Sequence, residues 1–466
     1  MKEYLAVDIG ASSGRHILGR YEDGKLVLEE IYRFDNGYVK KDGHSCWDID
    51  SLCAEVIKGI AACGKKGRIP ALIGIDTWAV DFVLLDSSGK RIGDAVAYRD
   101  KRTADMDKLV EKEISFSELY SRTGIQKQVF NTIYQLTALK NEAPEQLERA
   151  ERLLLIPDYL NYCLTGKMTN EYTNASSTAL VDAADKSWDF ELIERLGFKK
   201  PIFGKISMPG TVIGGFTEEV KAKVGFDSQV VLPATHDTGS AFLAVPARDD
   251  NAVYISSGTW SLLGIENMKP ITTKAGMEAN FTNEGGYQGR YRYLKNIMGL
   301  WMIQSIRRNY DKKYSFAQLE DFARENSDFE SLVNVNDGRF LAPESMIEEI
   351  QQACRESGQR IPEKPGEIMQ CVYGSLAEGY RESIKELEAL SGKSFTSINI
   401  VGGGSKDSYL NSLTAKAAGI PVYAGPTEGT ALGNLMVQMI TDGVFADLQE
   451  ARSAIKKSFE IKKYNP

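Results

Sequence analysis

The chain has 466 residues, of which 42% are hydrophobic and 26% are charged, a composition typical of a soluble globular protein with two or three domains. Its net charge of −8 is spread along the sequence, so we expect no nucleic-acid partner, although a local cationic pocket for a nucleotide stays compatible with this charge. No apolar run approaches the roughly 20 residues that cross a bilayer, and Lys2, Glu3 and Asp8 interrupt any signal-peptide core, so we expect a cytoplasmic protein without a membrane partner.

The first predicted strands flank a short polar loop. Three segments are apolar or alternate in polarity and are joined by tight turns, namely Leu5–Val7, Arg15–Arg20 and Lys25–Phe34. The first turn lies in VDIGASSGR, Val7–Arg15, where backbone and hydroxyl donors can surround a phosphate. The loop lacks the lysine of a P-loop NTPase and the spacing of a dinucleotide motif. Taken alone, it is equally compatible with an ordinary glycine-serine hairpin turn.

A helix and two buried strands are predicted next. The helix begins near Asp48 and Asp50, whose side chains can cap its free amides, because apolar residues recur at helical spacing after them. Residues 71–93 then contain two continuous apolar runs, which are typical of buried strands. Between the runs lies a polar group made of Asp76, Thr77, Trp78 and Asp81. From about residue 111 to residue 169 the sequence is richer in helix formers.

The pattern of the N-terminus recurs twice in the second half of the chain. The apolar strand Val253–Ile255 runs into the turn SSGTWSLLG, residues 256–264. The apolar strand Ile398–Val401 enters Gly402–Gly404, and a helix follows. One glycine turn is usually only a turn, but three at the ends of apolar strands indicate a duplicated fold that binds one polyphosphate from two sides.

These segments resemble the FGGY family of sugar kinases, within the superfamily of actin, hexokinase and Hsp70-like ATPases. The resemblance runs in the same order from about Tyr4 to Asn434 through VDIGASSGR, IGIDTWAVDF, VAYRD, ATHDTGSA, SSGTW, NEGG, LKNIMGLW and VGGGSKDSYLN. It implies an α/β fold of two duplicated actin-like (ribonuclease H-like) domains, with mixed sheets flanked by helices and with ATP and sugar in the cleft between the domains. Residues 1–245 would hold the phosphate loop, the sugar site and the catalytic base, and residues 246–466 would bind the nucleotide.

For ATP and Mg²⁺, the resemblance implies residues in both domains. Asp8 matches the aspartate that orients Mg²⁺ through water, and one carboxylate beside phosphates is chemically sufficient. Its structural alternative is a strand-end aspartate that bonds the turn amides. Arg15 would supply positive charge, unless it is a surface arginine of the second strand, and Gln304 is by its spacing alone an exposed polar helix residue. The expected ATP contacts are Ala11, Ser12, Ser13, Gly14, Arg15, Thr259, Gln304 and Gly402.

For the reaction centre, Asp237 matches the catalytic base, which takes the proton of the attacking sugar hydroxyl. From its position, Asp237 can equally cap a helix, and the two roles are compatible because a helix N-terminus favours a carboxylate. Ala79 stands where the most similar pattern has a substrate-contacting glycine, and Asn296 can otherwise be a loop asparagine that bonds local backbone. The expected sugar contacts are Trp78, Ala79, Asp81, His236, Asp237, Thr238 and Asn296.

The reaction that the resemblance implies is ATP-dependent phosphorylation of the C1 hydroxyl of L-rhamnulose, which gives L-rhamnulose 1-phosphate and ADP in L-rhamnose degradation. Its alternatives are another FGGY kinase acting on fuculose, xylulose, ribulose or glycerol, an actin-like or Hsp70-like ATPase, and a sugar-responsive regulator. The expected partners are a small sugar and ATP, in a monomer or a homodimer. The six cysteines show no metal-ligand spacing with the three histidines, and we expect reduced thiols, with Cys354 and Cys371 close enough in sequence to pair if oxidised.

Overall fold

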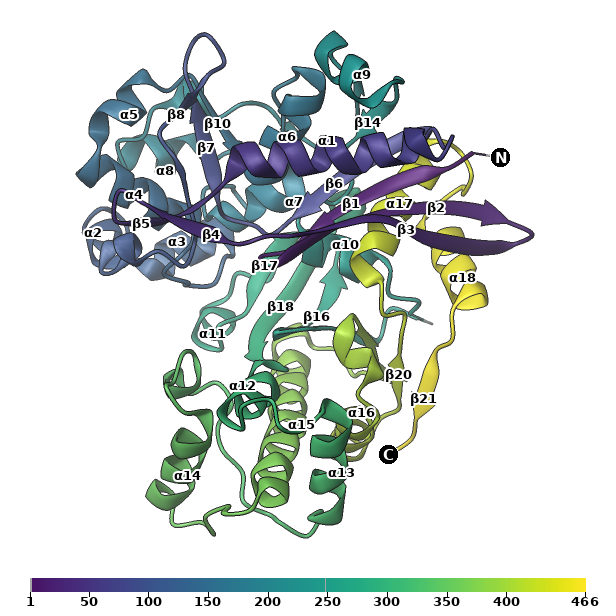
Figure 1. The fold of residues 1–466 in the computed structure, drawn as a ribbon. Helices are drawn as coiled ribbons and strands as arrows, with labels where there is room; N and C mark the ends of the chain where they lie inside the picture. Colours follow the sequence, from purple (N-terminus) through teal and green to yellow (C-terminus); the bar gives the residue numbers. More distant parts are fainter. Residues whose placement is uncertain (1, 248) are drawn as a thin grey trace. The chain divides into compact units, whose positions relative to one another are not determined.

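The computed structural model describes residues 2–247 and 249–466, which form two compact units (Figure 1). Unit 1 comprises Met1–Ala244, Glu266–Tyr293 and Thr430–Ser458, and unit 2 comprises Val245–Ile265, Leu294–Gly429 and Phe459–Pro466. This division differs from consecutive segments 1–245 and 246–466, because two later segments pack with unit 1.

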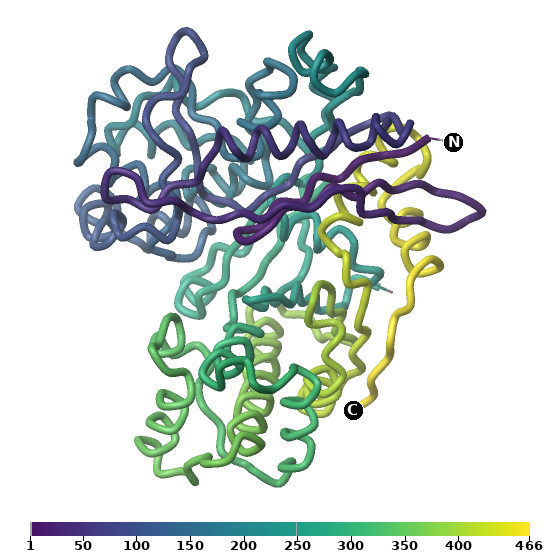
Figure 2. Tube along the Cα trace, viewed as in Figure 1, coloured from purple at the N-terminus to yellow at the C-terminus, as the bar shows by residue number. Residues whose placement is uncertain are grey.

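The return of the C-terminal segment to unit 1 has a clear physical cause. The side-chain amide of Asn434 donates to the carbonyl of Gly74, and the guanidinium of Arg452 donates to the carbonyls of Phe242 and Leu243. Figure 2 traces this segment, drawn in yellow, beside the purple N-terminal strands. The buried Asn434 and the partly buried Arg452 therefore join the segment to the first unit by polar contacts with residues far away in the sequence.

Unit 1 is built on a six-stranded mixed sheet in the order β13-β14-β6-β1-β2-β3. Its strands are β1 (Tyr4–Ile9), β2 (Ser13–Glu22), β3 (Lys25–Asp35), β6 (Leu72–Thr77), β13 (Val212–Gly215) and β14 (Gln229–Val231). β1 pairs antiparallel with β2 and parallel with β6, and β14 is parallel to β6. The predicted N-terminal strands and the buried strand after residue 71 are confirmed.

Helices cover both faces of this sheet. α1 (Ile49–Lys65), α6 (Ile156–Thr165) and α9 (Glu218–Val224) contribute to one apolar core with the alternate residues Leu5, Val7 and Ile9 of β1. The opposite face, which carries Gly74, is covered by α17 (Gly429–Thr441), and α10 (Asp237–Leu243) packs beside α17. Asp48 caps α1 by accepting from the amide of Ser51, as predicted, whereas Asp50 pairs with Arg91.

The remaining elements of unit 1 surround this layer, and many of them share a second apolar core. The strands are β4 (Tyr38–Lys41), β5 (His44–Trp47), β7 (Phe82–Leu85), β8 (Arg91–Ile92), β9 (Ala95–Val96), β10 (Arg152–Leu155), β11 (Asn170–Glu171), β12 (Ile206–Ser207) and β17 (Thr282–Gly285). The helices are α2 (Met106–Glu113), α3 (Phe116–Thr123), α4 (Thr132–Glu142), α5 (Pro144–Arg149), α7 (Tyr172–Ala175), α8 (Phe190–Arg195), α11 (Lys274–Glu278) and α18 (Leu448–Ser458).

Unit 2 repeats the strand order of unit 1. Its strands form β18-β16-β15-β19-β20-β21, to which β17 is added beside β18 as a seventh, edge strand; β15 is antiparallel to β16 and parallel to β19, and β20 is antiparallel to β21. The strands are β15 (Ala252–Ser257), β16 (Trp260–Asn267), β18 (Tyr291–Met298), β19 (Ser397–Val401), β20 (Val422–Ala424) and β21 (Lys462–Tyr464). The order matches β3-β2-β1-β6-β14-β13, so the predicted duplication is confirmed.

The helices of unit 2 are α12 (Trp301–Asn309), α13 (Phe316–Glu325), α14 (Met346–Glu356), α15 (Pro365–Ser391) and α16 (Ser408–Ala418). α13 and α16 pack along the long helix α15, and α16 confirms the helix predicted after the triple glycine. All six cysteines lie among the described residues and are free thiols. Within residues 2–247 and 249–466, no helix has the length and apolar character that crossing a membrane requires.

Candidate active site

Asp237 lies at the edge of the unit 1 sheet where parallel strands end. β1 and β6 end together, with Asp8 and Asp76 side by side in register. The segment before α10 joins the same edge, because the amide of Thr77 donates to the carbonyl of Thr235 at 2.9 Å. His236 is the N-cap residue of α10, and Asp237 is its first helical residue. The topology therefore brings Asp8, Asp76 and Asp237 to one edge.

The carboxylate of Asp237 has one oxygen held and one oxygen accessible. Oδ1 accepts from the backbone amide of Thr238 at 2.6 Å and from the Thr238 hydroxyl at 3.1 Å. Within the described chain, Oδ2 has no hydrogen bond, and the side chain is 34% exposed. The alternative of a helix cap is thus partly realised in a bond to the next residue, while a second oxygen can still meet a ligand.

A buried glutamate holds the segment that precedes Asp237. Glu171 is fully buried, and its Oε2 accepts from the Thr235 hydroxyl at 2.6 Å and from the Thr173 hydroxyl at 2.5 Å. The Thr173 oxygen in turn accepts from the His236 amide at 3.2 Å. Burial raises the pKa of Glu171 above its ordinary value, against these hydrogen bonds. No sequence pattern indicated Glu171.

The N-terminal loop is a tight hairpin whose two charged residues pair with each other. The amide of Gly10 donates to the carbonyl of Ser13 at 2.9 Å, and Ser12 is exposed at the tip. Arg15 lies opposite Asp8 in the register, and its Nη2 is 2.6 Å from Asp8 Oδ2. The phosphate contact predicted for Arg15 and the metal contact predicted for Asp8 stay predictions, and in the structure the two side chains form an ion pair.

Asp76 has a buried carboxyl oxygen without a hydrogen-bond partner at this edge of the sheet, among the described residues. The carboxyl is fully buried, its Oδ2 accepts from the side-chain amide of Asn434 at 2.6 Å, and Oδ1 has no hydrogen bond within the described residues. Burial, followed by the charges of Asp8 and Asp237, raises the pKa of Asp76 well above its ordinary value. A cation beside these carboxylates would offset their repulsion.

The donor set fits a hydrated Mg²⁺ ion better than a protein cage. Mg²⁺ keeps several waters and needs only one or two carboxylates with phosphate oxygens. Among the described residues, no cluster of three or more His, Cys, Asp or Glu side chains has metal-binding geometry. The pair of Asp8 and Asp76 therefore suits a cation held largely through its own waters.

The DTWAVDF segment builds a buried aromatic arrangement around Asp81. Asp81 Oδ2 accepts from the indole nitrogens of Trp47 at 2.6 Å and Trp78 at 2.9 Å, and Oδ1 accepts from the Gln135 amide at 2.9 Å. The two indole rings lie 4.0 Å apart between centroids. Burial, against these hydrogen bonds, raises the pKa of Asp81 to about 6. Asp81 thus points inward and orients the tryptophans, while Ala79 beside them is partly exposed.

His236 contacts two charged residues that the sequence did not single out. Its Nδ1 lies 3.0 Å from Arg292 Nη2 and 3.2 Å from Glu284 Oε2, and its Nε2 lies 3.4 Å from Asp237 Oδ1. Burial alone would raise the pKa of Glu284, but the charge of Arg292 lowers it to about 2. Glu284 belongs to the NEGG segment, which carried the resemblance without an assigned role.

In unit 2, the predicted nucleotide residues surround one turn. Thr259 is exposed at the tip of the β15–β16 turn, and its carbonyl accepts from the amide of Trp301 at 3.2 Å, so the turn adjoins α12, which carries Gln304. Gly402 has φ of 84°, and a Cβ there would lie 2.8 Å from the carbonyl oxygen of Ser257. The glycine loop therefore packs on the end of β15, where a larger residue would not fit.

Asn296 lies on β18 and has a buried side-chain amide oxygen. Its Oδ1 is buried and lacks a hydrogen bond among the described residues. Buried amide oxygens are normally paired, so this acceptor is suited to a ligand donor.

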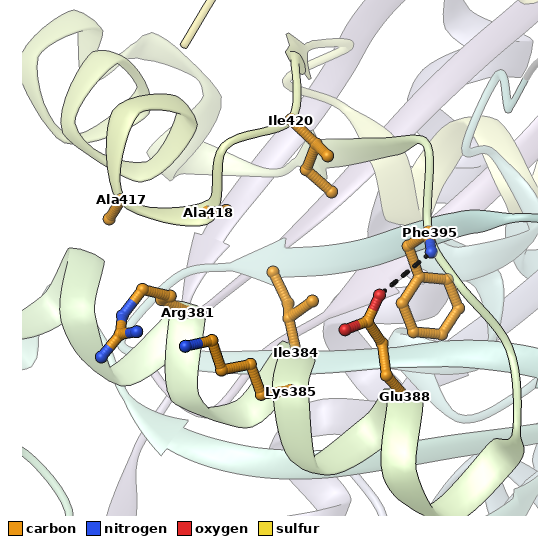
Figure 3. A pocket seen from close by; sticks show the side chains of 8 residues that line it. All are labelled: Arg381, Ile384, Lys385, Glu388, Phe395, Ala417, Ala418 and Ile420. Carbon is orange, nitrogen blue, oxygen red and sulfur yellow. Dashed lines mark hydrogen bonds between the residues drawn. The ribbon is translucent and has the colours of Figure 1, made fainter.

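Unit 2 also contains a cavity of about 150 Å³. Figure 3 shows its lining, where the amide of Phe395 donates to Glu388 Oε1 at 3.3 Å. The lining residues are Arg381, Ile384, Lys385, Glu388, Phe395, Ala417, Ala418 and Ile420. None of them is a predicted site residue.

Comparison with known proteins agrees with this architecture. Residues 3–244 match the N-terminal domain and residues 253–441 the C-terminal domain of the FGGY family of carbohydrate kinases. The chain is 52% identical over 460 residues to a rhamnulokinase of Oceanobacillus iheyensis, covering 99% of this chain and 97% of that protein. It is 51% identical over 464 residues to a rhamnulokinase of Halalkalibacterium halodurans, covering 100% and 99% of the two chains.

Solved structures support the fold. A ligand-bound xylulose kinase from Lactobacillus acidophilus has a TM-score of 0.84 at 19% identity, covering 100% of this chain and 94% of that one. A gluconate kinase from the same species has a TM-score of 0.83 at 19% identity, with the same coverage. The predicted α/β fold of two family domains is therefore confirmed.

Proposed function

The chain belongs to the FGGY family of carbohydrate kinases, and we propose that it transfers the γ-phosphoryl group of ATP to the C1 hydroxyl of L-rhamnulose. The products would be L-rhamnulose 1-phosphate and ADP. The observation that carries the chemistry is Asp237, which begins α10 with one oxygen held by Thr238 and the other available beside Asp8 and Asp76. The choice of sugar is supported by relatives named rhamnulokinase that share about half of their residues with this chain over its full length.

Asp237 acts as the general base in this proposal. Its Oδ2 takes the proton of the C1 hydroxyl while the hydroxyl oxygen forms a bond to the γ-phosphorus and the bond from phosphorus to the β,γ-bridging oxygen breaks, which releases ADP. Because Oδ1 is fixed by Thr238, the carboxylate is oriented before the sugar arrives. A positioned base is worth about 10² to 10⁴ in rate, and alignment supplies much of the remainder.

Asp8 and Asp76 would hold Mg²⁺, largely through its waters. When bound, the ion supplies charge neutralisation for the ATP phosphates. Arg15 and the loop Ala11–Gly14 would contact the same phosphates by charge and by hydrogen-bond donation. Arg15 already neutralises Asp8 at 2.6 Å, so phosphate binding would exchange one anionic partner for another.

The sugar and the nucleotide would be bound by different kinds of groups. Trp78 and Ala79 offer an apolar wall for the methyl group of the sugar, with His236 and Thr238 as polar contacts, and we assign Asp81 to orienting Trp78. Asn296 adds an acceptor from the C-terminal domain, residues 246–466. Thr259, Gln304 and Gly402 of that domain would contact ATP, while residues 1–245 carry the base.

A coupled ADP-release assay over L-rhamnulose, fuculose, xylulose, ribulose and glycerol tests the proposal. We expect the highest kcat/KM with L-rhamnulose, and phosphorus NMR of the product should place the phosphate on C1. Preference for another sugar would transfer the assignment to another FGGY activity. ADP release that no sugar stimulates would support an ATPase, and ATP binding without any ADP release would support a regulator.

A further inference from the structure

A buried arginine meets His236 on the side of the ring opposite Asp237. The side chain of Arg292 is 1% exposed, and its Nη2 lies 3.0 Å from His236 Nδ1. The other ring nitrogen, Nε2, is the one that faces Asp237 Oδ1 at 3.4 Å. Nδ1 therefore faces the guanidinium of Arg292 and, at 3.2 Å, the carboxylate of Glu284, whereas Nε2 faces the carboxylate of Asp237.

Proton chemistry decides how this contact works. A guanidinium remains charged in proteins and has five N–H donors but no acceptor. A hydrogen bond from Nη2 to Nδ1 at 3.0 Å requires Nδ1 to accept, in which case Nδ1 carries no proton and the ring proton of a neutral imidazole lies on Nε2.

The arginine is fixed in this position by further contacts. Its Nε donates to the carbonyl of Gly285 at 2.9 Å, and Nη2 also lies 3.0 Å from Glu284 Oε2. Gly239 of α10 packs next to the guanidinium, since a Cβ there would lie 3.7 Å from Arg292 Cζ. The strand pair β17–β18 thus presents a rigid donor to the residue before the base.

We propose that Arg292 is a positioning residue for the phosphoryl transfer, which holds His236 as a neutral imidazole with its proton on Nε2. His236 then donates a hydrogen bond toward Asp237 and the sugar and cannot take the proton of the sugar hydroxyl. If Nε2 lacked a proton, two acceptors would face each other at 3.4 Å and compete for that hydroxyl proton. The functional part of this inference rests on the proposed kinase activity.

The competing arrangement uses Glu284 instead of Arg292. Glu284 Oε2 lies 3.2 Å from Nδ1, so a protonated Nδ1 could donate to it and leave His236 an imidazolium. In the structure, however, Arg292 Nη2 lies 3.0 Å from both Nδ1 and Glu284 Oε2, so its two N–H groups can serve both acceptors, whereas a proton on Nδ1 would face a guanidinium donor at 3.0 Å. The geometry therefore favours Arg292 as the residue that sets the proton position.

Nitrogen-15 NMR of histidine-labelled protein tests the proton position directly, because the chain has only three histidines. The signals of His236 are assigned by their loss in His236→Asn. At pH 7.5, without sugar or ATP, we expect an unprotonated Nδ1 and a proton on Nε2. A proton on Nδ1, in either a neutral or a charged ring, would overturn the proposal. This readout does not depend on the sugar, so a wrong substrate assignment would appear in the sugar panel and not here.

Two variants separate the roles of the charged partners. Arg292→Met should move the proton to Nδ1 and lower kcat about 10- to 100-fold, with the KM for ATP near that of the parent. Glu284→Gln should keep the parental tautomer, since the donor to Nδ1 remains. Arg290→Met, which removes a nearby arginine without a hydrogen bond to His236, should leave tautomer and kcat unchanged. If Arg292→Met does not fold, the tautomer of the parent protein still decides the question.

Discussion

The two sheets have the same strand order, yet their strand ends carry different chemistry. In unit 1, β1 and β6 end near Asp8 and Asp76, and an ion pair with Arg15 lies across the hairpin. In unit 2, the corresponding strands β15 and β19 end in Ser256–Ser257 and Ile400–Val401, without a charged side chain. The duplication therefore preserved the topology of the backbone, whereas the ionisable groups at these strand ends are present in unit 1 alone.

The residues that follow β6 in unit 1 and β19 in unit 2 also differ between the two units. After β6 the chain bears large side chains, and Val80 adopts a φ of 69° that is unusual for a branched residue. After β19 the chain bears three glycines, and Gly402 adopts a φ of 84° without that cost. Unit 1 therefore presents side chains at this position and unit 2 presents backbone, which agrees with a sugar and its base on the first and a nucleotide on the second.

The largest expected effect is that of removing the carboxylate of Asp237, a charged group of unit 1. Asp237→Asn should lower kcat about 10²- to 10⁴-fold, because an amide cannot take the hydroxyl proton, with little change in either KM. Steady-state ADP release measures this effect. Exposed Asp185→Asn is a matched control and should retain parental turnover. Near-parental turnover of Asp237→Asn would show that the base lies elsewhere.

The buried charge of Asp81 predicts a pH dependence of stability. Because its pKa is raised to about 6 in the folded protein, from an ordinary value of 3.8, folding favours the protonated form. The contribution is fully present below about pH 4 and is lost as pH rises through 6, a change of about 3 kcal/mol at 1.36 kcal/mol per pKa unit.

Urea unfolding followed by the fluorescence of the five tryptophans, which include Trp47 and Trp78, can measure this difference. Between pH 4 and pH 7, the free energy of unfolding of the parent should fall relative to that of Asp81→Asn, which has no titrating group there. Parallel pH profiles for the two proteins would contradict the raised pKa.

Arg15 tests whether the charged hairpin of unit 1 contacts ATP. Arg15→Gln should raise the KM for ATP by roughly 30-fold, since a charge-assisted hydrogen bond contributes about 2 kcal/mol. Arg20→Gln, on the same strand and paired with Glu22, should leave that KM unchanged. Equal effects of the two substitutions would show that Arg15 does not contact ATP directly and acts only through its general charge or as a surface ion pair.

Local patterns predicted much of this architecture, and non-local contacts explain what they missed. The cap at Asp48 and the strands on either side of each glycine turn depend on neighbouring residues, so the sequence shows them directly. Asp81 lies three residues after Trp78, and its expected sugar contact stays a prediction. Its inward orientation depends on Trp47 and Gln135, which are distant along the chain, so no local pattern shows it.

The contacts around His236 show the same limit more strongly. Glu171 and Arg292 reach the residues before Asp237 only after the sheet and its neighbouring strands have formed. A single arginine or glutamate in a strand carries no periodic signal, and its role depends on a partner more than 50 positions away. Family resemblance identified the NEGG segment, but only the fold shows that Glu284 and Arg292 contact Nδ1 of His236.

The smallest expected effect tests the backbone surface of unit 2. A Cβ on Gly403 would have Ser257 O at 4.0 Å as its nearest atom, so Gly403→Ala should fold normally. If the nucleotide lies against this backbone, the added methyl group should raise the KM for ATP roughly fivefold, or about 1 kcal/mol, and leave the KM for sugar unchanged.

Gly338→Ala, at an exposed glycine with open space around it, is the control for an added methyl group. Gly404→Ala should instead impair folding, because its Cβ would overlap the Ser257 side chain. Unchanged ATP kinetics in Gly403→Ala would mean that the glycines serve the packing of the loop on β15 and not the nucleotide.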